Sequence, residues 1–504
     1  MFIKLPSAAV VGLTALPVTV EVDLQRGQTA FTVVGLPDAA IKEAKDRIYA
    51  ALKNAGFQYP FNHRLTINLA PADVPKEGSW YDLPMALGIA AAAAGLSWEL
   101  DDALIAGELA LDGSVRRIAG AVPLALFAKK HGRTKLFIPA ANAAQVSIVA
   151  GITIYPVQHL KELVDHLCGT HPIEIFTDPP APAQPPYFDN DLSMIKGQPF
   201  ARRALEIAAS GGHNLLLVGP PGSGKTLLAR TLPSILPALT PDETLEATAL
   251  YSAAGLLRDS VVVEPPFRAP HHTASMVALV GGGRFPRPGE ISLAHRGILF
   301  LDELPEFPRT VLESLRQPLE DGLVSVARAQ GTVQFPARFI FVASMNPCPC
   351  GYATDGSKPC TCAPQQVLRY QKRISGPLLD RIDLHVSVPR VPPEKLLDTT
   401  PSESSALVRS RVVAARARQT ARYAGTKLHT NSDLGPADVR RWCALPPEAA
   451  ALLRAASDRL HLSARSFSRL LKVARTIADL SAADTLGTEH VAEALQFRGS
   501  IHLE

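Results

Sequence analysis

The sequence predicts an α/β protein in which a phosphate-binding core follows an α/β domain and precedes a smaller α-helical domain. Three observations support this fold class. Residues Gly219–Thr226 fit the pattern G-x-x-x-x-G-K-T. Short, fully apolar runs around that motif are typical of parallel strands covered on both faces. From about residue 392 onward the apolar spacing becomes helical.

Length and composition limit the possible classes of protein. The 504 residues are enough for roughly three domains of ~150 residues each. With 47% hydrophobic residues, 19% charged residues and a net charge of +4, the chain has an ordinary globular balance that permits an anionic partner without requiring one. Its start, Met1–Lys4, lacks a targeting pattern. The longest apolar stretch, Leu83–Leu96, contains Pro84 and is too short to cross a bilayer. We therefore expect a cytoplasmic protein with reduced cysteines and no membrane partner.

The first domain is expected over residues 1–172. Strand patterns alternate there with helical ones, and Asp38 is placed as the N-cap of a helix that runs to Ala55. The predicted strands are Val18–Val22, Phe31–Val34, Leu65–Leu69, Leu136–Pro139 and Ile152–Tyr155. A proline-rich linker is expected over 173–190, because five of the eight residues from Pro179 to Pro186 are proline.

The phosphate-binding core is expected over 191–391 and the helical domain over 392–504. Three apolar runs in the core predict buried strands: Leu215–Val218, Ile298–Leu301 and Phe339–Ala343. Beyond the core, helical spacing predicts helices at Ala406–Tyr423, Pro447–Leu460 and Ser466–Leu480.

The glycine-rich motif predicts a site for the phosphates of ATP. Its glycines let backbone N–H groups point at phosphate oxygens, and the following helix adds its positive end. Lys225 is expected to reach the β- and γ-phosphates, and Thr226 to offer a hydroxyl to Mg²⁺. The motif consists of Gly219, Pro220, Pro221, Gly222, Ser223, Gly224, Lys225 and Thr226.

Polar residues at the ends of the next two apolar strands complete the expected site. Asp302 is expected to hold Mg²⁺, and Glu303 to orient and deprotonate the attacking water. Asn346, after the following strand, is expected to hold that water near the γ-phosphate. Without the glycine-rich motif upstream, solvated acids in a strand-end turn would explain Asp302 and Glu303 better. A turn asparagine before Pro347 would then explain Asn346 about equally well.

Four cysteines lie close together in the sequence. Two C-x-C pairs, separated by nine residues, can supply four thiolates to a structural Zn²⁺. This spacing is tighter than the usual C-x-x-C, so reduced thiols on a loop remain the alternative. The predicted zinc ligands are Cys348, Cys350, Cys360 and Cys362.

Taken together, these motifs and the segment Ser375–His385 resemble an AAA+ ATPase. The stretches Pro266–Ser275 and Val473–Leu480 narrow the resemblance to the magnesium-chelatase-like branch, and within it to the ComM (YifB-type) family. The resemblance covers essentially the whole chain. It implies a P-loop core followed by a helical lid, and a ring of subunits, which we expect to be a hexamer.

The resemblance also implies roles for two arginines. Arg381 matches the arginine finger, which reaches the γ-phosphate of the neighbouring subunit as a fixed cation. Arg465 matches the sensor arginine of the lid, with Arg469 one helical turn later as the alternative.

The family resemblance further suggests DNA contacts on two segments. An insertion from Pro266 to Ile291 carries mobile glycines, and a hairpin is expected over Val324–Val333. Basic hairpins facing a pore would grip phosphates without reading bases. An ordinary exposed hairpin is the alternative. The candidate contacts are Arg268, His271, His272, Arg284, Arg287 and Arg328.

The first domain resembles the Lon-type protease domain, which has the ribosomal S5 domain 2-like fold. The segment Ala70–Asp82 parallels the stretch around the Lon nucleophile, but Trp80 holds the serine position and Ser79 lies one residue early. Val122 holds the lysine position after Leu111–Gly120. Because a Ser-Lys dyad needs both groups, we expect a non-proteolytic scaffold or DNA-contact domain.

The leading functional hypothesis is therefore an ATP-driven DNA motor. The resemblance implies a helicase on single-stranded or branched DNA that promotes branch migration during homologous recombination in natural transformation, with the recombination machinery as a possible partner. A magnesium-chelatase motor subunit, which drives metal insertion into a tetrapyrrole, is the second hypothesis. An ATP-dependent protease is the third.

Overall fold

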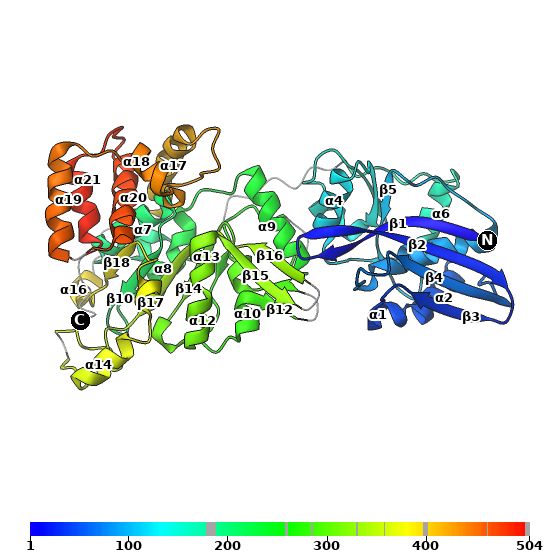
Figure 1. Cartoon of the computed structure of the whole chain (residues 1–504), viewed down its shortest axis with the longest axis horizontal. Coiled ribbons are helices and arrows are strands. Elements are labelled where there is room, and N and C mark those ends of the chain that lie inside the picture. Colours follow the sequence, from blue (N-terminus) through cyan, green and yellow to red (C-terminus); the bar gives the residue numbers. More distant parts are fainter. Residues whose placement is uncertain are drawn as a thin grey trace.

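A computed structural model describes residues 1–177, 188–257, 261–283, 286–328, 331–356, 358–396, 402–460 and 462–498. The molecule is elongated, with an α/β part at one end, the phosphate-binding core in the middle and a group of helices at the other end (Figure 1). The proline run that predicted a linker, Pro179–Pro186, lies outside the described residues.

The amino-terminal part begins with a four-stranded sheet of order β1-β2-β4-β3. Its strands are β1 (Phe2–Val11), β2 (Thr14–Arg26), β3 (Ala30–Val34) and β4 (His63–Ala70). Only the β3–β4 pair is parallel. Most of the apolar stretch Leu83–Leu96 forms the buried helix α3 (Asp82–Ala94), which packs against β1 and β2.

A second, parallel sheet of order β5-β8-β9 completes this part. Its strands are β5 (Ala103–Ile105), β8 (Lys135–Pro139) and β9 (Thr153–Val157). The continuous helix predicted from Asp38 to Ala55 is wrong in one respect: it is divided at Glu43. Asp38 caps the first piece as predicted, and its other oxygen accepts from the N–H of Gly78, which ties that turn to the 70–82 segment. The remaining elements are α1 (Ala39–Lys42), α2 (Ala44–Asn54), η1 (Ser79–Tyr81), β6 (Glu108–Leu109), β7 (Val115–Arg116), α4 (Ala121–Lys130), α5 (Ala140–Val146) and α6 (Leu160–Leu167).

The central core is a five-stranded parallel sheet of order β11-β14-β17-β10-β18. Its strands are β10 (Leu215–Val218), β11 (Phe267–Arg268), β14 (Ile298–Leu301), β17 (Ile340–Met345) and β18 (Leu384–Ser387). Alternate residues of β10, β14 and β17 enter two different hydrophobic cores, one on each face, which explains why these strands are apolar throughout.

Helices cover both faces of this sheet. Around it lie η2 (Leu192–Met194), α7 (Pro199–Gly211), α8 (Lys225–Ile235), α9 (Pro241–Ala253), α10 (Met276–Val280), α11 (Glu290–Leu293), η3 (Leu304–Glu306), α12 (Arg309–Ser314), α13 (Arg316–Asp321), α14 (Pro364–Gln371), α15 (Gly376–Leu379) and α16 (Pro393–Leu396). Two antiparallel pairs project from the core: β12 (Gly281–Gly282) with β13 (Arg287–Pro288), and β15 (Leu323–Arg328) with β16 (Gly331–Pro336). The second pair confirms the predicted hairpin.

The carboxyl-terminal part is helical, as predicted. It contains α17 (Ser405–Arg422), η4 (Asn431–Asp433), α18 (Pro436–Trp442), α19 (Pro447–Leu460), α20 (Ala464–Leu480) and α21 (Thr488–Gln496). Buried residues of α17, α20 and α21 share one hydrophobic core with α7, α8 and one face of the central sheet. The helical part is therefore packed onto the core without a separating solvent layer.

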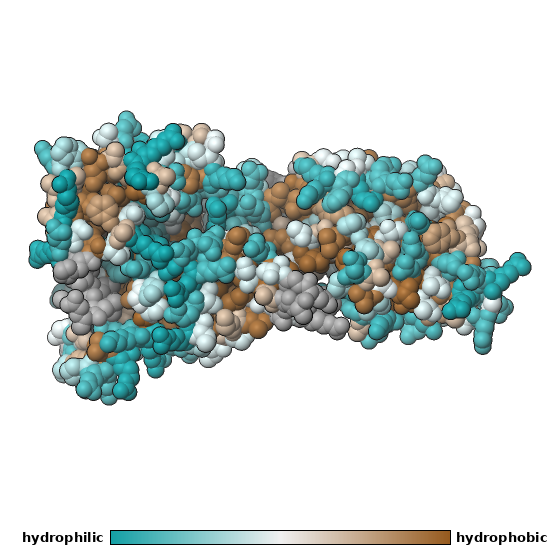
Figure 2. Space-filling model, viewed as in Figure 1, coloured by the Kyte–Doolittle hydropathy of each residue, from teal (hydrophilic) through white to brown (hydrophobic). Residues whose placement is uncertain are grey.

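The amino-terminal part contacts the core through α4 and α9. Backbone N–H groups of Gly120 and Val122 donate to the carbonyl and hydroxyl oxygens of Ser252, at 2.8 and 3.2 Å. Leu13 packs into the same hydrophobic core as the β15–β16 hairpin. Polar side chains cover most of the surface in Figure 2, with apolar side chains among them near this junction. Within the described part of the chain, none of the helices has both the length and the apolar character to span a bilayer.

Candidate nucleotide-binding site

The glycine-rich loop lies where its motif predicted, between β10 and the start of α8. Gly222 and Gly224 adopt φ values of +75° and +90°, which favour glycine. A Cβ on Gly219 would lie 2.1 Å from the carbonyl oxygen of Val388, so only glycine fits this close approach. The loop therefore has the backbone shape that a phosphate cradle needs.

Lys225 is buried at the first position of α8. Its ammonium donates to the carbonyl oxygens of Gly219 and Pro220 at 2.8 and 2.9 Å and to Oδ1 of Asn346 at 3.1 Å. Burial lowers the pKa of Lys225 from its ordinary value, and the nearby carboxylates of Asp302 and Glu303 oppose that shift. The ammonium is thus held over the loop, where it can contact phosphate.

Asp302 faces the helix that follows the loop. Its Oδ2 accepts from the hydroxyl of Thr226 at 2.8 Å, and its Oδ1 accepts from the hydroxyl of Ser344. Oxygen ligands of this kind suit Mg²⁺, so Thr226 and Asp302 could hold the ion together. Ser344, on β17, was not singled out in the sequence. It could have been found from the sequence, because it lies two residues before Asn346 on the strand that runs parallel to β14, which Asp302 follows.

Glu303 follows directly and has an exposed side chain. Its backbone adopts φ +53°, an uncommon conformation for a residue with a side chain. Within the described residues the carboxylate has no hydrogen-bond partner, while its N–H donates to the hydroxyl of Ser344 at 3.3 Å. The carboxylate is therefore free to accept a proton from water, as a general base must.

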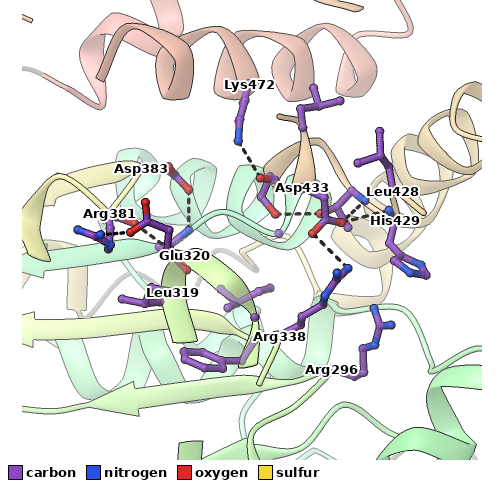
Figure 3. Close-up of a pocket in the computed structure, with 18 of the residues that line it drawn as sticks. Arg296, Leu319, Glu320, Arg338, Arg381, Asp383, Leu428, His429, Asp433 and Lys472 are labelled. Carbon is purple, nitrogen blue, oxygen red and sulfur yellow. Dashed lines mark hydrogen bonds and ion pairs between the residues drawn. The ribbon is translucent and has the colours of Figure 1, made fainter. Parts of the chain in front are cut away.

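The two arginines assigned to ATP hydrolysis lie together, away from the loop. Arg381 and Arg465 both donate to Glu320, the second at 2.8 Å. Arg381 is buried, and Arg465 is exposed. They line a cavity of about 830 Å³, shown in Figure 3, which none of the loop residues 219–226 lines.

This cavity lies at the edge of the sheet opposite the loop. Asn214, Gly297 and Asp383, which line it, immediately precede β10, β14 and β18, whereas the loop follows the carboxyl end of β10. Cationic side chains outnumber acidic ones along its wall. The cationic residues are Arg296, Arg338, Arg381, Arg416, Lys427, Arg465, Arg469 and Lys472, and the acidic ones are Glu243, Glu320, Asp321, Asp383 and Asp433.

Arg469, the alternative to Arg465, has a different environment. It donates to Asp383 at 2.6 Å and to the carbonyl oxygen of Arg381 at 2.9 Å. Asp383 is buried and also accepts from the N–H of Asn214 at 3.1 Å. Burial alone would raise the pKa of Asp383, but Arg469 and His213 hold it well below its ordinary value. Arg469 is thus part of a buried network that joins α20 to the core.

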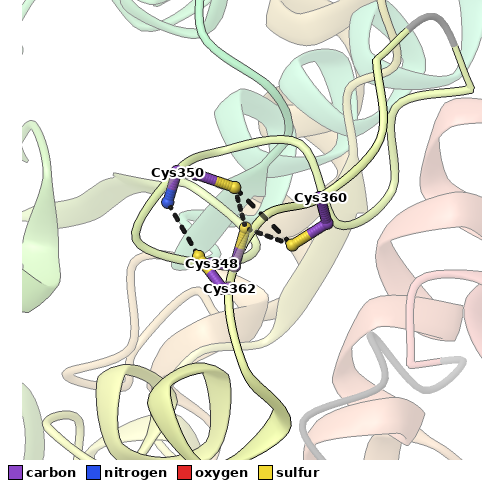
Figure 4. A group of neighbouring side chains, drawn as sticks. All are labelled: Cys348, Cys350, Cys360 and Cys362. Carbon is purple, nitrogen blue, oxygen red and sulfur yellow. Dashed lines mark hydrogen bonds between the residues drawn. The ribbon is translucent and has the colours of Figure 1, made fainter.

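The four predicted zinc ligands converge (Figure 4). All four sulfur atoms lie within 4.8 Å of one another, with pairs at 3.3, 3.5 and 3.6 Å among Cys348, Cys350 and Cys360. Zn–S bonds of ~2.3 Å in a tetrahedron place sulfur atoms roughly 3.8 Å apart, whereas a disulfide needs ~2.05 Å. The donor set therefore fits a closed Zn²⁺ site.

The cysteine loop packs on the nucleotide site. A Cβ added to Gly351 would lie 2.5 Å from Cδ of Pro221 and 3.8 Å from Cγ of Asn346. Gly351 itself adopts φ +86°. Gly351, which lies in the loop that carries the cysteines, is thus packed closely against Pro221 of the glycine-rich loop, beside the asparagine that bonds Lys225.

The predicted DNA contacts have different environments. Arg268 is half-buried and donates twice to Glu290, at 2.6 and 2.7 Å, so its charge is already matched within the insertion. His271 is exposed, and its ring lies 4.0 Å from that of His272. Arg287 is exposed and lies 3.6 Å from Glu77 of the amino-terminal part. Arg284 lies outside the described residues; Arg328 ends β15, and only its backbone is described.

No Ser-Lys dyad is present where the Lon resemblance would place it. The hydroxyl of Ser79 donates to Glu108, and Val122 is a buried residue at the start of α4. Lys76, the lysine nearest Ser79 in sequence, is buried and donates to the carbonyl oxygen of Pro71. The described geometry gives Ser79 no amine partner.

Comparison with known proteins shows the family of the chain. Family models described as "Subunit ChlI of Mg-chelatase", "Magnesium chelatase, subunit ChlI" and "Magnesium chelatase, subunit ChlI C-terminal" match residues 20–142, 191–396 and 402–498. The fold and site thus define a magnesium-chelatase-like protein of the AAA+ type.

Two full-length relatives narrow the assignment. YifB of Escherichia coli (strain K12) is 45% identical over 505 residues, covering 98% of this chain and 97% of its own length. Competence protein ComM of Haemophilus influenzae is 45% identical over 506 residues, covering 99% and 97%. Lon protease 2 of Bacillus subtilis is 28% identical over 134 residues, 26% of this chain and 24% of its own. The chain belongs to the ComM/YifB-type magnesium-chelatase-like family.

Proposed function

We propose that the protein is a ring-forming ATPase that moves along DNA, and that each of its active sites is shared by two subunits. The proposal depends mainly on one observation. Arg381 and Arg465 lie at the edge of the sheet opposite Lys225 of the same chain. They can stabilise a γ-phosphate only if it is bound to a neighbouring copy, whose loop would meet this edge.

Within one site, the roles follow from the contacts. The loop and Lys225 would bind the phosphates, and Thr226 and Asp302 would hold Mg²⁺, which neutralises charge on the phosphate oxygens when bound. Glu303 would take the proton of the attacking water, and Asn346 would place that water. The neighbour's arginines would then meet the charge that develops on the γ-phosphate.

A structural Zn²⁺ at the four cysteines is part of this proposal. Cys348 lies two residues after Asn346, and Gly351 packs against Pro221. The ion would thereby brace the loop and Asn346 without touching the substrate.

The DNA part of the proposal draws on the relatives and on the hairpins. One full-length relative is named a competence protein, which supports a role in natural transformation. The specific activity that we propose is a helicase that promotes branch migration during homologous recombination. The β15–β16 hairpin and the insertion around Arg287 and His271 are the segments we propose for DNA contact.

A magnesium-chelatase motor subunit is the second candidate, because the family models carry that description. The full-length match to a competence protein, which includes the amino-terminal part, favours the DNA motor. Proteolysis is not supported, because Ser79 has no amine partner in the described structure.

The test is hydrolysis of ATP by the purified full-length protein, with and without single-stranded and forked DNA, followed by strand displacement. We expect DNA to stimulate hydrolysis and forked DNA to be unwound, with Lys225→Ala as the inactive control. Hydrolysis that DNA leaves unchanged, together with no detectable DNA binding, would contradict the motor and favour the chelatase candidate.

A further inference from the structure

Three aromatic rings, two of them exposed, lie together on the amino-terminal part. Tyr49 lies on α2, and Tyr59 and Phe61 lie on the loop between α2 and β4. The ring centroids of Tyr59 lie 5.1 Å from Tyr49 and 5.4 Å from Phe61. Phe61 is 58% exposed and Tyr49 37%. Single exposed apolar residues are ordinary, but adjoining exposed rings form a patch that a partner can cover.

The backbone holds Phe61 outward. The next residue, Asn62, adopts φ +60°, donates its N–H to the hydroxyl of Thr29 at 3.0 Å, and accepts from the N–H of Gly27 at 3.1 Å. The ring nitrogen Nδ1 of His63 lies 2.9 Å from the carbonyl oxygen of Phe61. The chain on the carboxyl side of Phe61 is thus fixed to the end of the β2–β4 pair, and the N–H of Phe61 donates to the carbonyl oxygen of Tyr59 at 2.8 Å.

Cationic residues neighbour the rings on α2 and at the end of β2. Lys45 and Lys53 lie four residues on either side of Tyr49, on the same face of α2. Arg26 is the cross-strand partner of His63, which follows Phe61 and Asn62 at the start of β4. All three of these cations are exposed, and none forms an ion pair with another described residue.

The charge around the rings is therefore positive on balance. On the helical stretch 42–53, three lysines stand against two acidic residues, Glu43 and Asp46, and Arg47 is already paired with Asp82. Flat aromatic rings can stack on exposed bases, and cations without acidic partners can contact phosphates. This surface therefore suits a nucleic-acid strand whose bases are accessible. A duplex hides its base faces in the stack, so an unpaired strand fits this surface better.

We propose that this aromatic–basic patch, formed by Tyr49, Tyr59, Phe61, Arg26, Lys45 and Lys53, binds single-stranded DNA. Bases stack on Phe61 and Tyr49, while Arg26 and the two lysines contact phosphates. This inference rests on the proposed function for its choice of nucleic acid. The binding itself needs no ATP, so the two can fail separately.

The experiment measures binding of fluorescent oligo-dT to the full-length protein by anisotropy, without nucleotide. The main variant is Phe61→Ala, with Tyr49→Ala/Phe61→Ala as the stronger form. Phe2→Ala is the matched control, because Phe2 is 55% exposed on the same domain and lies beside a lysine, Lys4. Thermal unfolding of each variant checks that the fold is retained.

We expect the double variant to weaken oligo-dT binding about tenfold or more, as the loss of stacked bases predicts, and Phe2→Ala to leave it within twofold. An abasic strand of the same length should bind the wild type more weakly than oligo-dT does. The double variant should no longer distinguish the two strands, since the stacking surface is gone. Lys53→Glu should weaken both strands and reduce the dependence of binding on salt.

Three results would overturn the proposal: unchanged oligo-dT affinity in the double variant, an equal loss for oligo-dT and the abasic strand, or a loss accompanied by a change in oligomeric state, which would make the patch a contact between copies. If DNA does not change the rate of ATP hydrolysis by the wild type, but the double variant still loses oligo-dT binding, the motor proposal is wrong and the proposal for the patch is supported.

Discussion

Arg381 and Arg465 come from different parts of the chain and donate to the two oxygens of one carboxylate, that of Glu320. One arginine follows the short helix α15 in the core, and the other lies near the start of α20 in the helical part. Glu320 lies near the end of α13, just before the β15–β16 hairpin. The hairpin, the core and the helical part therefore meet at one carboxylate.

Arg381→Ala should lower kcat for ATP by a factor of about a thousand or more and leave ATP binding nearly unchanged, because an arginine finger acts on the transition state of a neighbour's site. Steady-state kinetics and nucleotide titration would measure the two effects. Mixing Arg381→Ala with Lys225→Ala protein should restore part of the activity, since some shared sites then hold both native residues. A mixture that assembles but stays inactive would show that the two residues do not serve one shared site.

Glu320→Gln should lower kcat by about tenfold with little change in KM, because two guanidinium groups repel each other without the carboxylate that holds them. Asp321→Asn is the matched control, since Asp321 lines the same cavity but has no ion pair in the described structure. If the Glu320 and Asp321 variants behave alike, Glu320 does not position the arginines.

Glu303→Gln should bind ATP and assemble normally while turnover falls by about a hundredfold or more, which is the scale of losing a general base. An amide has the same size but takes up no proton at neutral pH. Turnover at the wild-type rate would mean that another group activates the water.

Purified protein should contain one zinc ion per chain, and Cys360→Ser should reduce that content. Because Gly351 packs on Pro221, loss of the metal should also weaken ATP binding. Metal analysis together with nucleotide titration, before and after chelation, checks both effects. Active, reduced protein without zinc would contradict the site.

Asp383→Asn should destabilise the protein by about 3–5 kcal/mol, because it leaves Arg469, whose side chain is only 22% exposed, without a matching charge. The folded-state pKa of Asp383 lies below its unfolded value near 4. Its contribution is thus present above about pH 4 and is lost as the pH falls through the folded-state pKa. Urea unfolding of both proteins across this range should show that the variant lacks this acid-dependent component.

Local chemistry made much of the site predictable. Thr226 bonds Asp302, and two glycines of the loop adopt positive φ values, as their motifs indicated. These features were predictable because a glycine motif and a polar residue at a strand end each determine the geometry of only a few neighbouring residues. The cysteine cluster was predictable for the same reason: its four ligands lie within one short loop.

Contacts between distant segments were not predictable. Glu320 has no motif, and its role emerges only when Arg381 and Arg465 meet it in space. Arg268 was expected to contact DNA, yet a glutamate 22 residues later in the chain forms an ion pair with it. The division of the first predicted helix at Glu43 likewise accompanies a tertiary bond, from Gly78 to Asp38.

The single hydrophobic core that joins α20 and α21 to the central sheet has a mechanical consequence. A hinge inside this core would expose many apolar side chains to water, at a high cost. The helical part and the sheet of one chain should therefore turn as one rigid body when ATP is hydrolysed. Motion would concentrate at the boundaries between neighbouring copies, where each stroke would change the angle between whole subunits.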